Sequence, residues 1–375
     1  MKPVIAQSGV VTAYGWGLDS LWDGLMSGRT AITSSDRFAE RGFVSNQIAV
    51  VPDLGVERGD SRSMAMLRRL LTPIIGQINP KTPLILATTV GEIEFVEQAV
   101  LDNKPEYAQR ARPLVLLERV KQLLGLTGPA MVLSSACASS TAALTRAAAM
   151  IRHGEADSVL LVTCDAVSEF VYSGFSTLLS LCESPASPFD CNRTGLTLGE
   201  AAAWALITPD SSSLADQSAP AILGWGNTTD AVHMTAPDRN AAGLSRAITK
   251  ALAMSGTNAA DVDLIAAHGT ATVYSDAMEM IAFRHAMGAP RPTFSIKGGV
   301  GHTLAAAGLV QVLVAARAME LGVVPPTVGL TSPEPAAAGW VFGVPVPLKK
   351  SRLTLSTNSG FGGVNTAVLL GGGER

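Results

Sequence analysis

The stretch MVLSSACASSTAAL, residues 131–144, places one cysteine among small residues where an apolar strand gives way to a helical pattern. A sulfur in such a position lies near the unpaired N–H groups of a helix N-terminus, which favour the thiolate. The small neighbours of Cys137 would let a substrate carbonyl approach closely. The same features also fit a buried structural cysteine, so Cys137 alone does not establish a nucleophile.

Two histidines occupy comparable turns. His268 ends the apolar run VDLIAA, and His302 follows the glycine-rich stretch KGGVG and precedes an alanine-rich helical segment. Each could be structural, but the chain has only five histidines and two of them share the turn type of Cys137. One thiol and two imidazoles at such turns predict a nucleophilic site in which the imidazoles carry protons or stabilise an oxyanion. After His268, Asp276 and Glu279 have the spacing of a capping box for the next helix.

The glycine-rich stretch GGVGHTLAAAG, residues 298–308, raises nucleotide binding as an alternative. It lacks the full G-x-G-x-x-G spacing and a suitable acid downstream, and it does not match G-x-x-x-x-G-K-[ST]. Flexible glycines beside Lys297 and His302 fit the close approach of backbone to a substrate equally well. The stretch is therefore interpreted as part of the candidate site.

The composition bounds the class of protein. The chain has 375 residues, of which 47% are hydrophobic and 16% charged, so it can build a large core. Its net charge of −3 gives no overall electrostatic footprint for nucleic acid. The cysteines show neither CxxC pairing nor metal-ligand spacing, which indicates a reducing cytoplasm and no metal site. These cysteines are Cys137, Cys164, Cys182 and Cys191.

Two apolar segments could be taken for membrane or signal segments, and neither sequence favours that interpretation. The amino terminus has one Lys and an apolar run broken by polar residues, so residues 1–17 predict a first strand and turn rather than a signal peptide. The apolar helical segment from Leu304 is interrupted by Gln311 and Arg317 and is expected to fall short of a membrane span. We therefore expect a soluble, cytoplasmic protein without a membrane partner.

Short apolar runs alternate with alanine-rich helical stretches, which is the pattern of βαβ units. The hydrophilic stretch 209–220 has no periodic apolar pattern and predicts the link between two halves, residues 1–210 and 221–375. The segments around Cys137 and His302 share one plan of strand, small-residue turn and alanine-rich helix, so halves built alike would bring these turns together. The predicted strands are PLILATTV, AMVLSSA, SVLLVTC, AWALITP, DLIAAHG, TFSIK, LTLSTN and TAVLL.

Several ordered motifs together resemble the β-ketoacyl-acyl-carrier-protein synthases, the thiolase-fold condensing enzymes of fatty acid and polyketide synthesis. The likeness covers nearly the whole chain. It implies an α/β fold of two similar βαβ-rich halves that form a layered α/β/α/β/α core. The motifs are SSACASS, SPFDCNRTGLTLGE, TDAVHMTAP, AAHGTATVYSD, SIKGGVGHTLAAAG and SGFGGVN.

The resemblance also implies roles for residues. Cys137 would take an acyl group from acyl carrier protein, and His268 and His302 would assist malonyl decarboxylation before a Claisen condensation. Lys297 matches a supporting lysine. The N–H groups of Cys137 and Phe361 match the oxyanion hole. The matching gates are Phe361 with its neighbours Gly360, Gly362 and Gly363, and a second loop with Asp230 and His233.

Substrates would arrive on the phosphopantetheine of acyl carrier protein, with no further cofactor. Acyl carrier proteins are acidic, and the dense basic cluster of the first half predicts a docking helix, with a solvated helix face as the alternative. Its arginines are Arg62, Arg68 and Arg69. The expected assembly is a homodimer or a heterodimer with a related ketosynthase subunit.

Two features narrow the class. A thiolase would need a second reactive cysteine in SGFGGVN, and an initiating Cys-His-Asn synthase would lack His302, so the resemblance implies an elongating Cys-His-His synthase. The alternative is a non-condensing partner subunit like a chain length factor, although such subunits usually lose the nucleophile. Two departures bear on activity: Gln311 stands where the family has Glu, and the segment between Met64 and Cys137 is short.

Overall fold

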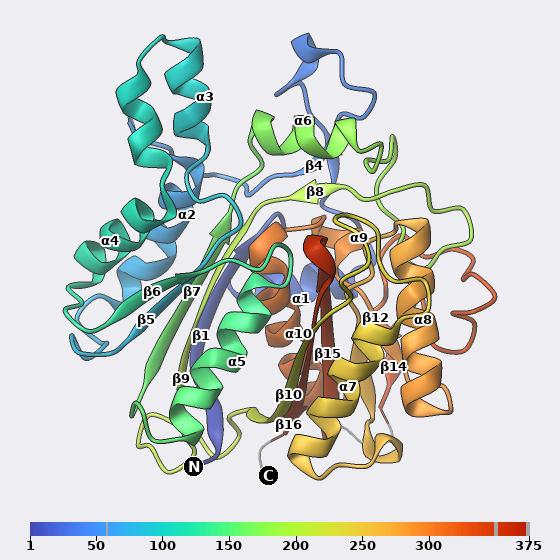
Figure 1. Ribbon diagram of the computed structural model, residues 1–375. Coiled ribbons are helices and arrows are strands. Elements are labelled where there is room, and N and C mark those ends of the chain that lie inside the picture. Colours follow the sequence, from blue (N-terminus) through green and yellow to red (C-terminus); the bar gives the residue numbers. More distant parts are fainter. Residues whose placement is uncertain (58, 349–351, 373–375) are drawn as a thin grey trace.

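The computed structural model describes residues 1–57, 59–348 and 352–372. Its main sheet runs in the order β12-β11-β15-β16-β10-β1-β9-β7-β5-β6, with β2 (Gly15–Trp16) paired to β1 (Figure 1). The strands of the first half are β1 (Pro3–Thr12), β5 (Leu84–Ala87), β6 (Ala130–Leu133), β7 (Val159–Asp165) and β9 (Ala201–Pro209). Those of the second are β10 (Ala221–Thr229), β11 (Leu264–Ala266), β12 (Thr293–Phe294), β15 (Leu353–Gly360) and β16 (Val364–Gly371).

The two halves of the sheet repeat one pattern. From β1 outward, the pairs with β9 and then β7 are antiparallel, and those with β5 and β6 are parallel. From β10 outward, the pairs with β16 and β15 are antiparallel, and those with β11 and β12 are parallel. The strand before Cys137, β6, therefore corresponds to the strand before His302, β12. This correspondence agrees with the shared plan seen in the sequence.

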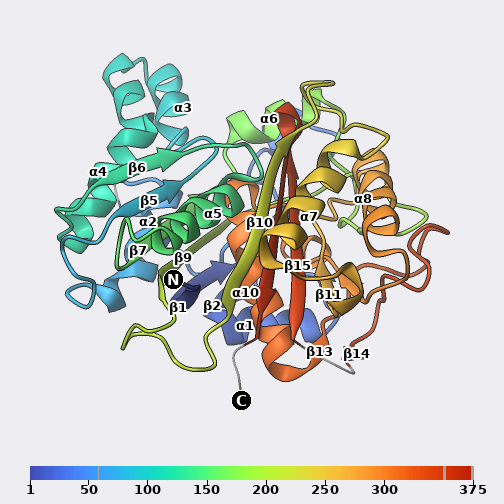
Figure 2. The same ribbon diagram turned by 60° about the horizontal axis from the view of Figure 1, so that its bottom comes forward.

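The helices and the two halves of the sheet stack in five layers (Figure 2). The central helices α5 (Ser139–Arg152) and α10 (Ala307–Leu321) share one core with strands of both halves. On the outer faces, α2 (Arg62–Leu71) and α4 (Pro113–Leu124) cover the first half, and α7 (Ala242–Ser255) and α8 (Val273–Met287) cover the second. Alternate residues of β7 serve both layers: Leu161 belongs to the central core and Leu160 to the outer one. The predicted α/β/α/β/α layering is confirmed.

Smaller elements lie around this core. The helices are α1 (Leu18–Met26), α3 (Glu94–Leu101), α6 (Glu169–Thr177) and the short α9 (Lys297–Val300). The strands are β3 (Thr33–Ser34), β4 (Gln47–Ala49), β8 (Leu198–Gly199), β13 (Val323–Val324) and β14 (Val346–Pro347). In Figure 1, α6 and β8 lie near the upper end of the sheet, where β15 also ends.

All eight strands predicted from apolar runs are present, and the predicted link falls between β9 and β10. The division into residues 1–210 and 221–375 as domains stays a prediction. One expectation is wrong: the segment Leu304–Leu321 is long and apolar enough to span a membrane. It is 78% buried within the protein, however, because α10 packs between the two halves of the sheet.

Candidate active site

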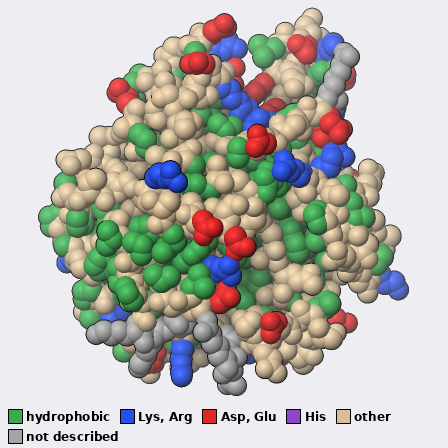
Figure 3. Space-filling model, turned by 180° about the vertical axis from the view of Figure 1, so that it is seen from behind, with side chains coloured by type: hydrophobic (Ala, Val, Ile, Leu, Met, Phe, Trp, Pro, Cys, Tyr) green, Lys and Arg blue, Asp and Glu red, His purple; other side chains and the backbone are tan. Residues whose placement is uncertain are grey.

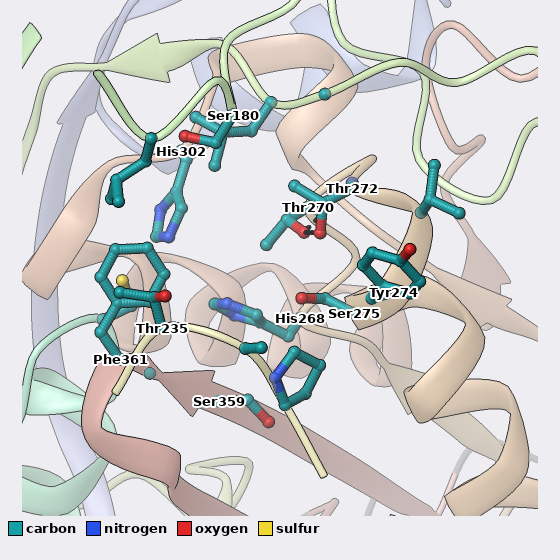
Figure 4. Close-up of a pocket in the computed structure, with 18 of the residues that line it drawn as sticks. Ser180, Thr235, His268, Thr270, Thr272, Tyr274, Ser275, His302, Ser359 and Phe361 are labelled. Atoms are coloured by element: carbon teal, nitrogen blue, oxygen red, sulfur yellow. Dashed lines mark hydrogen bonds between the residues drawn. The ribbon is translucent and has the colours of Figure 1, made fainter. Parts of the chain in front are cut away.

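A pocket of about 340 Å³ collects the turns that the sequence singled out. Cys137, His268, His302 and Phe361 all line it. Figure 4 shows the imidazoles of His268 and His302 pointing into the space beside the Phe361 ring. The ring centroids of the two histidines are 5.3 Å apart and nearly perpendicular. The fold therefore brings together side chains that are up to 224 positions apart in the sequence.

The turn that carries Cys137 is tight and strained. Ala136 has a φ of 48°, a left-handed backbone conformation that residues with a side chain seldom adopt. The Ser139 hydroxyl accepts the N–H of Ser135 at 2.8 Å and so closes the turn. Gly360 allows β15 to approach, since a Cβ there would lie 3.1 Å from the Cys137 nitrogen. The strand end and the nucleophile turn are therefore in direct contact.

The electrostatics of Cys137 differ from the prediction. Burial raises the pKa of its thiol to about 11, although the Lys297 ammonium and the N–H groups of Phe361 and of Cys137 itself act in the opposite direction. Asp165 adds to the increase. The expected net preference for thiolate is thus wrong, because desolvation outweighs the helix N-terminus. The two N–H groups that bond the sulfur are those expected for the oxyanion hole.

His268 is buried at the end of β11 and held from one side. Its Nδ1 lies 3.0 Å from Nδ2 of Asn358 and 3.2 Å from Nζ of Lys297. Lys297 also donates to the His268 carbonyl. Burial lowers the pKa of His268 well below its usual range, and Lys297 and His302 add to the effect. A neutral ring with Nδ1 surrounded by donors carries its proton on Nε2, on the side of the ring away from these partners.

In His302, as in His268, Nδ1 faces a donor and Nε2 carries the proton. Its Nδ1 accepts the N–H of Leu304 at 3.2 Å. Burial lowers its pKa well below the usual range, and the Lys297 ammonium contributes. The carboxylate of Asp165 accepts the N–H of Ala305 at 2.9 Å and thereby fixes the turn that follows the imidazole. Both histidines are therefore neutral and keep an Nε2–H donor, for which the described part of the chain supplies no partner.

Two acids on α8 support the His268 turn. Glu279 accepts the N–H groups of His268 at 2.8 Å and Gly269 at 2.6 Å. Asp276 accepts the N–H groups of Thr270 at 2.9 Å and Ala271 at 3.1 Å. Neither acid caps α8, so the capping-box interpretation is wrong. The signal in the sequence was their spacing of three, which places both carboxylates on one face of the helix.

Lys297 begins α9 and is 1% exposed, behind His268 rather than in the pocket wall. Burial lowers its pKa, while the carboxylate of Glu279 opposes the change. Its contacts with the His268 carbonyl and Nδ1 fit the supporting role that the resemblance implies.

The predicted gates lie side by side. Phe361 stacks on Phe175 of α6 with centroids 5.5 Å apart, and Gly362 and Gly363 have φ values of 82° and 73°. Asp230 lines the pocket and donates its N–H to the Gly363 carbonyl at 2.8 Å. His233 is exposed outside the pocket lining, and its Nδ1 accepts backbone N–H groups of its own loop. Whether these loops open stays a prediction.

The arginines predicted to dock a carrier have internal partners. Arg62 makes two bonds, of 2.7 and 2.6 Å, to the carboxylate of Glu200, whose side chain is fully buried. Arg68 pairs with Asp60 at 2.9 Å, and Arg69 stacks on Trp16 at 4.0 Å. On the face opposite to that of Figure 1, some basic side chains stand beside acidic ones and others stand alone (Figure 3). Arg62 and Arg68 are therefore paired with acids, whereas Arg69 is exposed, and carrier docking through this helix stays a prediction.

Gln311, the departure from the family pattern, lies buried on α10. Its Nε2 is within 2.7 Å of the Ala266 carbonyl and 3.0 Å of the Thr357 carbonyl. A carboxylate at this position would face two carbonyl oxygens without a proton to share. The amide therefore suits its surroundings and joins α10 to β11 and β15.

Sequence comparisons agree with this geometry. Residues 95–213 match the profile "Beta-ketoacyl synthase, N-terminal domain", and residues 220–331 match "Beta-ketoacyl synthase, C-terminal domain". A Streptomyces virginiae protein named as a polyketide beta-ketoacyl synthase is 33% identical over 70% of this chain and 65% of its own.

Two solved structures have the same fold over the whole chain. The ishigamide ketosynthase/chain length factor has a TM-score of 0.89 at 26% identity and covers 99% of both chains. A beta-ketoacyl synthase from Burkholderia phymatum has a TM-score of 0.89 at 25% identity and covers 100% of both. Since the two profiles fall on the two halves whose turns meet at Cys137 and His302, the chain belongs to the beta-ketoacyl synthase family.

Proposed function

We propose that this protein is an elongating β-ketoacyl-acyl-carrier-protein synthase. The observation that carries the proposal is the pairing of a thiol, bonded by two backbone N–H groups, with two neutral imidazoles whose Nε2–H groups are free. Such a site offers one oxyanion pocket for acyl transfer and a second for an enolate.

In the first half-reaction, Cys137 attacks the thioester carbonyl of a carrier-bound acyl chain. The N–H groups of Cys137 and Phe361 stabilise the oxyanion, the carbon–sulfur bond to phosphopantetheine breaks, and the thiol proton passes to the departing sulfur. Because burial holds the thiol protonated at neutral pH, this proton must leave during attack. The acyl group then rests on Cys137 in a pocket sheltered by Phe361.

In the second half-reaction, malonyl thioester binds with its carbonyl oxygen facing His268 and His302. The carboxylate leaves as CO₂, and its bonding electrons form an enolate whose oxygen accepts both Nε2–H groups. The enolate carbon attacks the acyl-Cys137 carbonyl, the bond to Cys137 breaks, and the released thiolate takes up one proton. The product is a β-ketoacyl thioester on the carrier.

We also propose that the protein acts as a dimer. The strand β6 ends the main sheet, directly before the Cys137 turn, and Met131 on it is 39% exposed. An exposed sheet edge of this kind readily pairs with another chain. The ishigamide relative is described as a ketosynthase/chain length factor, which supports a related subunit as one candidate partner.

The alternative function is that of the non-condensing partner in such a pair. The departure at Gln311 is the observation that favours it, and the retained Cys137 opposes it. The two functions differ in which chain must hold the nucleophile.

A condensation assay separates them. The purified chain is incubated with acyl carrier and malonyl carrier, and the carrier is read by intact mass. We expect the β-ketoacyl carrier to form, to disappear with Cys137→Ala and to persist with Cys191→Ser, since Cys191 is exposed away from the pocket. Product that forms only with a second ketosynthase subunit, and that survives Cys137→Ala in this chain, would establish the alternative.

A further inference from the structure

We propose that Thr141 and Asn358 form a positioning relay that, together with Lys297, holds the tautomer of His268 from the helix that follows the nucleophile turn. The catalytic consequence rests on the proposed function, whereas the tautomer itself can be measured without any substrate. Thr141 lies on α5, one helical turn after Cys137, and Asn358 lies on β15. Both side chains are fully buried.

The relay is a short chain of hydrogen bonds. The hydroxyl of Thr141 lies 2.6 Å from Oδ1 of Asn358. The amide nitrogen of the same side chain lies 3.0 Å from Nδ1 of His268. Helix α5, which follows the Cys137 turn, is thereby connected to the His268 imidazole through the side-chain amide of Asn358.

The direction of each bond follows from the charge beside the ring. Lys297 places its ammonium 3.2 Å from Nδ1 of His268 and also donates to the His268 carbonyl. A second N–H on Nδ1 would face this cation, so Nδ1 accepts. Asn358 must then turn its NH₂ toward the ring and its oxygen toward Thr141, whose O–H donates.

Space for the relay comes from Gly308 on α10. A Cβ at that position would lie 2.0 Å from the Thr141 hydroxyl oxygen and 2.9 Å from Oδ1 of Asn358. The absent side chain admits a polar contact between the two central helices and β15. A buried polar group without a partner is costly, so the Thr141 hydroxyl holds the amide in one orientation.

Removing the hydroxyl releases the amide. With Thr141→Val, Asn358 can rotate by 180° and present its oxygen to Nδ1. The amide then favours a proton on Nδ1 and opposes Lys297 instead of supporting it, so the fraction of His268 rings with a proton on Nε2 falls. The pocket then loses part of its His268 donor. Asn358→Asp should invert the tautomer more strongly, since a carboxylate can only accept.

The kinetic test separates positioning from general damage. We expect Thr141→Val to slow malonyl decarboxylation about tenfold, the factor that matches one net hydrogen bond, and to leave acylation of Cys137 within about twofold. Thr141→Ser keeps the hydroxyl and should restore the rate. Thr354→Val is the matched control, since Thr354 is a buried threonine on β15 whose hydroxyl has no partner among the described residues. Equal loss in both half-reactions, or equal loss with Thr354→Val, would overturn the relay.

The direct test is ¹⁵N NMR of histidine-labelled protein, in which only five histidines give signals. His268 is identified by its loss in His268→Gln. We expect Nε2–H in the wild type and in Thr141→Ser, and a proton on Nδ1 in Asn358→Asp. A wild-type proton on Nδ1 would refute the proposal. The expected tautomers in a protein that does not condense carrier substrates would refute the proposed function alone.

Discussion

The turn after β6 and the turn after β12 hold the same place in the two halves of the molecule and do different chemistry. The first runs from Leu133 to Ser139 with one strained residue, Ala136, and presents a sulfur with its own N–H. The second inserts the short helix α9, which carries Lys297, before it reaches His302. The additional helix brings a buried cation behind the imidazoles.

The difference teaches how one scaffold serves two half-reactions. Acyl transfer needs backbone N–H groups near the sulfur, and the tight turn supplies them. Decarboxylation needs neutral imidazole donors. Burial lowers both histidine pKa values, and the longer turn supplies a charge that adds to this effect. Each turn is also held from the opposite half, since Ser140 on α5 accepts the N–H of Leu309 at 2.9 Å.

The largest effect should come from removing one imidazole at a time, either His302 from the turn after β12 or His268 from the turn after β11. His302→Ala and His268→Ala should each slow malonyl decarboxylation by about a hundredfold or more, because an oxyanion donor is lost, and should change acylation of Cys137 far less. The measurements are CO₂ release from malonyl carrier and the mass of the acylated chain. Normal decarboxylation in both variants would show that the two turns do not divide the chemistry in this way.

A smaller effect should follow from removing the cation of the second turn. Burial raises the Cys137 pKa, and the Lys297 charge opposes that increase. Lys297→Met should therefore raise the Cys137 pKa further, lower the thiolate fraction and slow alkylation by iodoacetamide by about tenfold at pH 7, where Lys297, with a pKa of about 8, is mostly charged. In the wild type the rate of alkylation should keep rising with pH above pH 8, because burial raises the pKa of the Cys137 thiol to about 11. Alkylation that is unchanged by the substitution would mean that Lys297 does not reach the sulfur.

The last prediction concerns stability rather than chemistry, at the contact between α10 and the strand that ends at Gly360. Gln311→Glu should lower the free energy of unfolding by about 1–3 kcal/mol at pH 7, because the new carboxylate faces two carbonyl oxygens. The loss should shrink as the pH falls and the carboxyl gains a proton. Urea denaturation at pH 5 and pH 7 measures both values, and an unchanged or increased stability would contradict this account of the departure from the family pattern.

Much of the fold was readable because apolar runs of strand length specify buried strands directly. The three reactive residues were readable because Cys137 and His268 follow such runs, His302 follows a glycine-rich stretch, and all three stand beside small residues. The partners were not: Asn358, Glu279 and Asp165 are ordinary polar residues whose role depends on which turns meet in space. The spacing of Asp276 and Glu279 suggested a capping box, because local spacing does not show which distant N–H groups a carboxylate accepts. The basic cluster suggested a docking surface, because the sequence does not show that Arg62 pairs with Glu200.

The most direct test of the central claim is the mass of the Cys137 peptide after the purified chain meets an acyl carrier. The account predicts an increase equal to one acyl group on Cys137 and on none of Cys164, Cys182 and Cys191, together with free carrier thiol in equal amount. Acylation at another residue, or an unmodified Cys137 peptide while an authentic synthase is acylated by the same carrier, would contradict it.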